Sequence, residues 1–272
     1  MYGIIFFNNG NREKMLSLQI AASGMMAQEH RTETVANNLA NLNTTAFQRR
    51  RLEFKGLISR NLIRPDSVSS GAGESVPSGV HSGLGVQSAS VYKISEQGHL
   101  KKSENPLDIA IQGAGYLQIQ LPSGELAYTR DGSFQLSPDG QLVTHDGYPL
   151  QPAINIQSNA KNITINSSGV VLVSLPGQEE PANVGSIQLA LFPNQGGLES
   201  MGNNLMLQTS TSGDPVVVGP GVSGAGTLVQ GFLEGSNVNA IEEVANLIRA
   251  QRAYEMNAKV MQTADRMMAQ GK

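Results

Sequence analysis

One stretch decides the fold of this 272-residue chain: residues 16–42 read LSLQIAASGMMAQEHRTETVANNLANL. Eight of its positions step by alternating threes and fours, and six of the eight are apolar: Leu18, Ala21, Met25, Gln28, Thr32, Val35, Leu39 and Leu42. This spacing is typical of a helix with one apolar seam. We therefore expect a helix of about 28 residues and about 42 Å at this end of the chain.

The other end of the chain repeats the pattern, again with six apolar members among eight: Val244, Leu247, Gln251, Tyr254, Ala258, Met261, Asp265 and Met268. A lone helix with one apolar stripe is marginal in water, so each helix needs a partner. We predict a coiled-coil-like, discontinuous domain made of residues 15–55 and 235–272, in which the polar seam positions set the register. Periodicity leaves open whether the seams also contact neighbouring subunits or form only an intramolecular hairpin.

The middle of the chain has a different character. Residues 56–90 are dense in Ser and Gly and contain Pro65 and Pro77, which predicts an extended arm. Residues 91–234 contain short alternating runs separated by turn signals such as Pro138-Asp139-Gly140, which predicts an antiparallel β body. The predicted fold class is thus mainly β with α-helical termini. Residues 1–14 precede the seam and are interpreted as an upstream extension or a disordered tail.

Composition excludes several classes of function. The net charge is -3, the pI is near 5.8, and basic residues gather only around Arg49, Arg50, Arg51 and Lys55, which argues against a nucleic-acid binder. No run approaches the ~20 apolar residues of a membrane span. Residues 2–7 (YGIIFF) lack the basic region and cleavage site of a secretory signal. We therefore expect no membrane insertion and no cleaved signal peptide.

Residues suited to catalysis or metal binding do not form a recognisable pattern. The chain has no Cys, and its four His lie at positions 30, 81, 99 and 145, without metal-ligand spacing. Gly113-Ala114-Gly115 begins like a dinucleotide fingerprint, but the strand-like run YLQIQL follows where a helix would be needed. We interpret it as a glycine turn between strands. The sequence predicts no catalytic residue, metal or cofactor, and hence no enzyme.

Motifs at both ends of the chain resemble those of a known family. Residues 36–41 read ANNLAN and residues 42–49 read LNTTAFQR, which resembles the N-terminal signature of the bacterial flagellar rod and hook proteins. Their C-terminal signature is similar to SNVN at residues 236–239, Glu242-Glu243, and QRAYE at residues 251–255 with Asn257 and Lys259. Shorter similarities lie at residues 128–134 (YTRDGSF), 197–200 (GLES) and 230–232 (QGF). Together they cover nearly the whole chain from Met15.

The chain departs from the family pattern at two positions. The family usually has Gly before the Phe of the first signature and a basic residue after it, whereas Ala46 and Gln48 flank Phe47 here. The resemblance therefore does not carry over a left-handed backbone at residue 46 or a basic contact at residue 48.

The resemblance implies a structural subunit of a helical tube in the flagellar basal body. The terminal helices would line an inner tube, the β body would face outward, and the polymer would span the periplasm and transmit torque. Implied partners are further copies of the chain, other rod, hook and bushing-ring proteins, and the flagellar export apparatus. Implied assembly residues are Asn37, Asn38, Asn41, Phe47, Asn237, Asn239, Gln251, Arg252, Tyr254 and Glu255.

Several readings stay open. The asparagines either tie adjacent helices together or merely form a frayed helix end. Arg252 and Glu255 lie three residues apart and either pair locally or reach a neighbour. A rod subunit is favoured over a hook subunit because a rod member of the family resembles this chain in carrying extra residues at 56–85. A carbohydrate-binding or carbohydrate-cleaving β protein would need aromatic platforms or paired carboxylates, and neither is evident.

Overall fold

The computed structural model describes residues 3–57, 60–63, 80–157, 159–176 and 180–269. Contacts divide the chain into two compact units: residues 1–40, 50–92 and 239–272 form a helical unit, and residues 41–49 and 93–238 form a β-rich unit. The predicted division differs from these units. Residues 41–49 and 235–238, predicted within the helical domain, belong to the β-rich unit, and the arm belongs with the helices.

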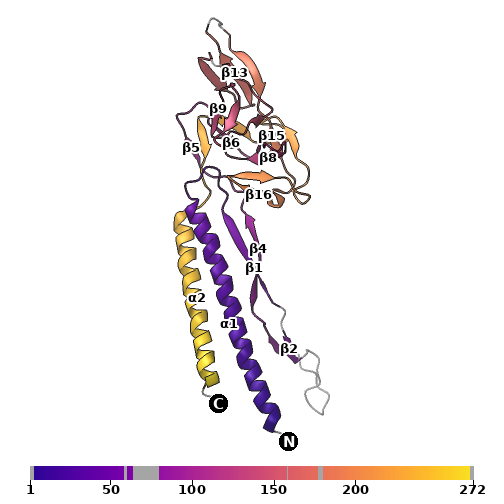
Figure 1. Cartoon of the computed structure of the whole chain (residues 1–272), viewed down its shortest axis with the longest axis vertical. Helices are drawn as coiled ribbons and strands as arrows, with labels where there is room; N and C mark the ends of the chain where they lie inside the picture. The colour runs from indigo at the N-terminus through magenta and orange to yellow at the C-terminus, as the bar shows by residue number, and fades with distance from the viewer. Residues whose placement is uncertain (1–2, 58–59, 64–79, 158, 177–179, 270–272) are drawn as a thin grey trace. The chain divides into compact units, whose positions relative to one another are not determined.

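Two long helices dominate the helical unit. Helix α1 comprises Gly3–Ala40 and helix α2 comprises Ala240–Ala269, and the two run antiparallel along each other (Figure 1). Helix α1 begins upstream of Met15, so residues 3–14 are helical, which contradicts a disordered tail; the alternative of an upstream extension stays a prediction. The sequence pattern recognised the helix only from Leu16 because the heptad spacing of apolar residues starts there.

The predicted extended arm is a two-stranded ribbon. Strand β1 (Arg50–Gly56) pairs with β4 (Val86–Lys93), and β2 (Arg60–Ile63) pairs antiparallel with β3 (Val80–Ser82). Residues 50–55, which were predicted within the helical domain, are therefore part of a strand. The ribbon begins at residue 50 and ends at residue 93, so it is longer in sequence than the predicted arm of residues 56–90. Part of the predicted arm, residues 64–79, lies outside the described residues.

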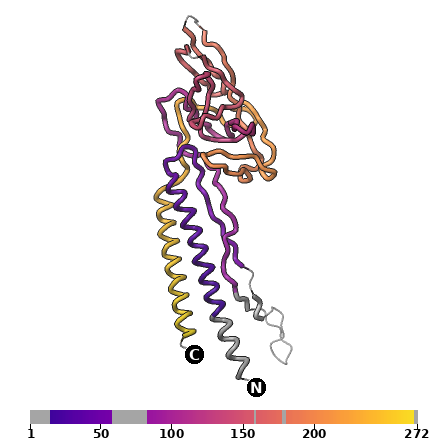
Figure 2. The backbone as a smooth tube through the Cα atoms, in the orientation of Figure 1, coloured from indigo at the N-terminus to yellow at the C-terminus, as the bar shows by residue number. Residues whose placement is uncertain are grey.

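Helix α1 lies between α2 and this ribbon, as the tube in Figure 2 also shows. Ser23 Oγ donates a hydrogen bond to Ile20 O at 2.8 Å and accepts one from Val86 N at 3.3 Å. Gly85 has φ +109, and a Cβ built there would come within 2.3 Å of Ser23 Oγ. The ribbon can approach the helix this closely because residue 85 has no side chain.

The β-rich unit is built from short antiparallel strands, as predicted. Its largest sheet has five strands in the order β11-β7-β8-β17-β16: Leu150–Gln151, Leu117–Gln120, Leu126–Thr129, Leu205–Leu207 and Glu199–Gly202. A second sheet has the order β12-β13-β14: Asn162–Ile165, Val170–Ser174 and Ala182–Ser186.

The remaining strands of this unit form two-stranded pairs. These are β9 (Phe134–Leu136) with β10 (Leu142–Thr144), β15 (Leu189–Leu191) with β18 (Val216–Val218), β6 (Ile109–Gln112) with β19 (Thr227–Gln230), and β5 (Leu100–Lys102) with β20 (Phe232–Glu234). A single 3₁₀ turn, η1 (Gln195–Gly197), is present among the described residues.

The core of the β-rich unit is aliphatic, with one aromatic cluster. Ile109, Leu117, Ile119, Leu150 and Leu189 are fully buried in the aliphatic part. In the aromatic part, the Phe192 ring contacts the rings of Tyr116 and Tyr128 edge-on, with centroid distances of 5.9 and 4.7 Å. The Gly113-Ala114-Gly115 segment is the turn between β6 and β7, with positive φ at both glycines, which confirms its interpretation as a glycine turn.

Candidate assembly surfaces

The contact between α1 and α2 is made by small side chains. On α1 the predicted seam is buried or half-buried from Leu18 to Leu39, and Leu42 lies beyond the end of the helix, in the β-rich unit. On α2 the buried residues are Glu243, Ala250 and Ala264, one position before the predicted Val244, Gln251 and Asp265, which are exposed. At these three positions the predicted α2 seam is wrong by one residue, whereas the predicted Leu247, Ala258, Met261 and Met268 are half-buried. The same alternating spacing fits two sets of positions that are one residue apart. The prediction took the set with the larger apolar side chains because apolarity was its only criterion.

The reason for the shift is close approach of the helices. A Cβ added at Gly24 of α1 would lie 2.8 Å from Asn257 Nδ2 of α2, so little space remains between the backbones there. Alanines fit such a contact, whereas Tyr254, which is 45% exposed, does not. Several large apolar side chains of α2 are consequently left exposed.

These outward side chains form a stripe on α2. The most exposed are Ile241 at 84%, Ile248 at 46%, Met256 at 61%, Val260 at 52% and Met267 at 50%. At 100° per residue, Ile241 and Ile248 lie on the side of the helix opposite Ala250 and Ala264, whereas Met256, Val260 and Met267 lie between that side and the buried alanines. Helix α1 exposes Met15 and Met26 in the same way, at 66% and 61%. Large apolar residues gathered on one exposed side of a helix indicate an interaction surface.

A shallow groove runs beside the contact between the helices. Glu29, Thr32 and Glu33 of α1 line one wall, and Gln251, Tyr254 and Glu255 of α2 line the other. Three of the predicted assembly residues therefore lie together in the groove. The fourth residue of that motif, Arg252, is exposed, and the described residues give it no local ion pair with Glu255.

The asparagines at the end of α1 act within the chain. Asn38 is 1% exposed, and its Nδ2 donates to Arg50 O at 2.9 Å while its Oδ1 accepts from Arg50 N at 2.8 Å. The side chain thus imitates a strand partner for the first residue of β1. Asn41 Oδ1 accepts from Thr44 Oγ1 at 3.1 Å, and Asn37 is exposed on α1. Asn38 is neither a tie between adjacent helices nor a frayed end.

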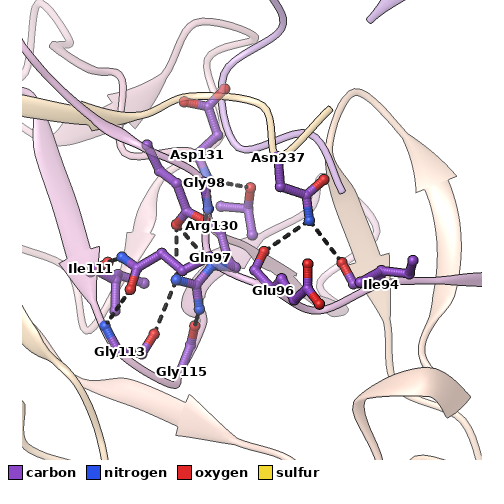
Figure 3. A network of polar contacts seen from close by, with 12 residues as sticks. Ile94, Glu96, Gln97, Gly98, Ile111, Gly113, Gly115, Arg130, Asp131 and Asn237 are labelled. Carbon is purple, nitrogen blue, oxygen red and sulfur yellow. Dashed lines mark hydrogen bonds and ion pairs between the residues drawn. The ribbon is translucent and has the colours of Figure 1, made fainter. Parts of the chain in front are cut away.

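Asn237 ties three segments of the β-rich unit together (Figure 3). Its Nδ2 donates to Ile94 O at 2.9 Å and to Glu96 O at 2.8 Å, and its Oδ1 accepts from Arg49 N at 2.7 Å. Its own N–H donates to the carbonyl oxygen of Phe47 at 3.3 Å, and the Phe47 side chain is buried. The residue is therefore a structural link between the two family signatures.

Asn239 caps the N-terminus of α2. Its Oδ1 accepts hydrogen bonds from Ile241 N at 3.0 Å and Glu242 N at 3.4 Å, and Glu243 N closes the first helical turn onto Asn239 O at 3.0 Å. This is the preferred geometry for an asparagine N-cap, in which the side chain satisfies backbone donors of the first turn.

The two departures from the family pattern are accommodated locally. Ala46 has φ 55, so residue 46 is left-handed although it is not glycine, and its N–H donates to Glu234 O at 2.7 Å. Gln48 is buried and hydrogen-bonds Tyr116. Burial raises the pKa of Tyr116 above its ordinary value of 10.0, while the Gln48 hydrogen bond and the Arg130 charge act in the opposite direction.

A buried ion pair lies in the same unit, and sequence reasoning did not single it out. Arg130 is 7% exposed, and its Nη2 lies 2.8 Å from Glu234 Oε2. Its Nε also donates to Glu234 Oε2, at 2.9 Å. The remaining guanidinium hydrogen bonds go to the carbonyl oxygens of Gly115 and Gly113, both at 3.0 Å, and Figure 3 shows the side chain pointing at this turn. Glu234 Oε1 accepts from Gly98 N at 3.1 Å. The sequence offers one weak signal for this pair: Arg130 and Glu234 are charged residues next to strand-like runs, in YTRDG and FLEG.

The described residues contain no helix long and apolar enough to cross a membrane. In that part of the chain, no three or more His, Asp or Glu side chains are grouped so that they could hold a metal ion.

The fold thus combines antiparallel terminal helices, which expose large apolar side chains, with a separate β-rich unit. Known families match segments of both units. Residues 18–48 match the flagella basal body rod protein family, residues 110–173 match the flagellar hook protein FlgE/F/G D1 domain, and residues 229–272 match the flagellar basal body rod FlgEFG protein C-terminal family.

Whole-chain relatives carry related names. The chain is 52% identical over 254 residues to the flagellar basal-body rod protein FlgG of Caulobacter vibrioides, covering 93% of this chain and 97% of the relative. It is 45% identical over 252 residues to the protein of the same name from Buchnera aphidicola subsp. Schizaphis graminum, covering 93% and 96%. The chain therefore belongs to the flagellar basal-body rod protein family and is a structural protein of the rod.

Proposed function

We propose that the chain is a subunit of the distal rod, which polymerises into a rigid helical tube that transmits torque from the motor to the hook. The observation that carries this proposal is the outward stripe of Ile241, Ile248, Met256, Val260 and Met267 on α2. Exposed apolar area of this kind is unfavourable in water, and equivalent helices of neighbouring copies would cover it. Contacts that repeat without closing into a ring produce a helical polymer.

We assign a different structural role to each of the two units. The terminal helices line the inner tube and make the axial contacts, and the β-rich unit faces outward. Other rod proteins, hook proteins and the bushing ring are the neighbours along the axis, and the flagellar export apparatus delivers the chain without a cleaved signal. No catalytic role is proposed.

Two alternatives come from the same family. A proximal rod subunit or a hook subunit would share the terminal motifs, and the chain is also 31% identical over 268 residues to the flagellar hook-basal body complex protein FlhP of Bacillus subtilis. The distal rod is favoured by the higher identity to the FlgG proteins, at 45–52% for the two compared above. A carbohydrate-binding protein is a weaker alternative, tested by pull-down on glycans and peptidoglycan.

Electron microscopy of the purified chain tests polymer formation. The intact chain should form straight tubes with a narrow lumen. Ile248→Glu places a charge in the outward stripe of α2 and should leave a folded monomer. Leu136→Glu is the matched control, because Leu136 has a similar exposure of 41% but lies in the β-rich unit. Tubes formed equally well by Ile248→Glu would contradict the proposal.

Rod and hook subunits should differ in stiffness, which we assign to the arm. Deletion of residues 65–79 removes no part of either helix and should leave polymers that bend. The deleted segment lies outside the described residues, so this assignment rests on its Ser- and Gly-rich sequence, which only neighbours would order. Straight, rigid tubes from the deletion variant would refute it.

A further inference from the structure

An open recess lies on the β-rich unit, between the start of β8 and the loop that joins β17 to β18. Its volume is about 660 Å³, which falls in the range of roughly 300–1,000 Å³ that is typical of small-ligand sites. Its walls are mostly polar with some apolar surface, and they include Glu125, Leu126, Tyr128, Gln208, Ser210 and Asp214. The recess lies entirely within the β-rich unit.

The loop between β17 and β18 is held in shape by its own hydrogen bonds. Thr209 Oγ1 donates to Gly197 O at 2.6 Å, and Thr209 N donates to Ser212 Oγ at 3.0 Å. Gln208 Nε2 donates to Asp214 Oδ1 at 2.8 Å, which holds the amide and the carboxylate together on the wall of the recess. A wall that is already ordered loses little conformational entropy when a ligand binds.

Tyr128 is the residue that points to a ligand. It is 2% exposed, and its ring packs edge-on against Phe192. A buried tyrosine hydroxyl usually has a hydrogen-bond partner, but the hydroxyl of Tyr128 has none within the part of the chain that the structure describes. Tyr128 lines the recess, so a ligand there can reach it. Burial raises the pKa of Tyr128 above its ordinary value of 10.0, so the hydroxyl can donate at neutral pH.

The charges of the recess limit the class of ligand. Glu125 and Asp214 are exposed carboxylates, and none of the described residues that line the recess is basic. These charges disfavour a phosphate or a carboxylate and favour a cation. The hydroxyl of Tyr128 and the side chains of Gln208 and Ser210 suit a ligand with several hydroxyl groups. A ligand that combines an amine with ring hydroxyls is an amino sugar.

We propose that this recess binds an amino sugar, a six-membered sugar ring that carries a protonated amine. The amine contacts the carboxylates of Glu125 and Asp214, and ring hydroxyls bond to Tyr128 and Ser210. The C–H face of the ring covers Leu126, which is 41% exposed. This inference goes beyond the proposed function and does not depend on it, because a structural subunit can carry a ligand site on its β-rich unit.

Three monosaccharides with the same ring test the proposed class of ligand. Glucosamine carries a cationic amine where N-acetylglucosamine has a neutral amide and glucose has a hydroxyl. In a ligand-observed NMR titration of the intact chain, glucosamine should bind with a Kd of about 1 mM, and the two neutral sugars at least about tenfold more weakly. Butylamine, which has the amine without the ring, should also bind at least about tenfold more weakly.

Tyr128→Phe tests the site because it removes only the hydroxyl. That hydroxyl has no partner in the described protein, so the midpoint of thermal unfolding should stay unchanged while glucosamine binding weakens by about fivefold. Tyr116→Phe is the matched control. Tyr116 is equally buried in the same aromatic cluster, but its hydroxyl bonds to Gln48 and it does not line the recess. This control should lower stability and leave glucosamine binding unchanged.

The carboxylates are tested by variants that keep their shape. Glu125→Gln and Asp214→Asn should each weaken glucosamine binding by about tenfold and change N-acetylglucosamine binding little. Asp214→Asn retains an oxygen that can accept from Gln208 Nε2, so the wall is kept. Asp139→Asn, at an exposed carboxylate outside the recess, is the control and should bind both sugars like the intact chain.

A glucosamine tetramer separates two sources of the same chemistry. Tighter binding of the tetramer than of the monomer would identify a sugar chain, equal binding would identify a free sugar, and both results support the site. Equal binding of glucosamine and the neutral sugars, or of glucosamine and butylamine, would overturn the proposed ligand class. Glucosamine binding that is absent, or that is unchanged in Tyr128→Phe and Asp214→Asn, would overturn the site. None of these outcomes bears on polymer formation.

Discussion

Replacing Asn237 should destabilise the β-rich unit by about 3 kcal/mol. Asn237→Ala removes three side-chain hydrogen bonds, to Ile94 O, Glu96 O and Arg49 N. At about 1 kcal/mol each, their sum sets the expected loss in the free energy of unfolding. For a unit of this size the midpoint of thermal unfolding should fall by roughly 6–12 °C. Calorimetry and urea denaturation of the full chain measure both quantities.

Asn237→Asp separates hydrogen bonding from shape. Aspartate has nearly the same volume and still accepts from Arg49 N, but at neutral pH it sets an anionic oxygen against the carbonyls of Ile94 and Glu96. It should therefore cost at least as much stability as Asn237→Ala. Asn43→Ala, at an exposed asparagine, is the control and should change stability by less than about 0.5 kcal/mol. A loss for Asn237→Ala as small as that of the control would refute the assigned role.

Three further predictions follow from single residues. Ala46→Gly should change the free energy of unfolding by less than about 0.5 kcal/mol, because relief of the left-handed backbone offsets the lost methyl group and the added entropy of the unfolded chain. Ala250→Gly, in helix α2, should cost about 2 kcal/mol. Equal losses for the two variants in urea denaturation would contradict the left-handed conformation assigned to residue 46. Asn239→Ala should cost about 1 kcal/mol and speed amide exchange in the first turn of α2, whereas Asn239→Asp should retain the cap; similar exchange in both variants would argue against capping. The raised pKa of Tyr116 contributes stability that is fully present below the unfolded value of 10.0 and is lost as the pH rises through the folded pKa. Tyr116→Phe should therefore flatten the fall in stability above about pH 10, and an unchanged slope would count against burial as the cause.

The terminal helices show how far periodicity reaches. On α1 the predicted seam positions up to Leu39 are buried or half-buried, but the buried residues Ala27 and Asn38 lie outside the seam. On α2 the buried residues are Glu243, Ala250 and Ala264, and several larger apolar residues, such as Ile248 and Met256, are exposed. Two heptad registers one residue apart look alike in sequence, and only the close approach at Gly24 distinguishes them.

The predicted assembly residues were recognised from the motifs, but their partners were not. The side chains of Asn38 and Asn237 bond to backbone groups of other segments, and that of Asn239 bonds to the first turn of α2. Asn237 reaches Arg49, which is 188 residues away. No local pattern encodes such a pair, because chain folding alone decides which backbone groups meet.

By itself the sequence determined the class of the protein: heptad spacing at both ends, turn signals between short alternating runs, and two family signatures. Those features are local, and local spacing is what sets helix and strand periods. Only the tertiary structure decided that small residues join α1 to α2, that Ala46 adopts a left-handed backbone, and that Arg130 is buried against Glu234. Each of these depends on the space and partners that distant segments provide, because close packing and the satisfaction of buried polar groups are properties of the folded chain.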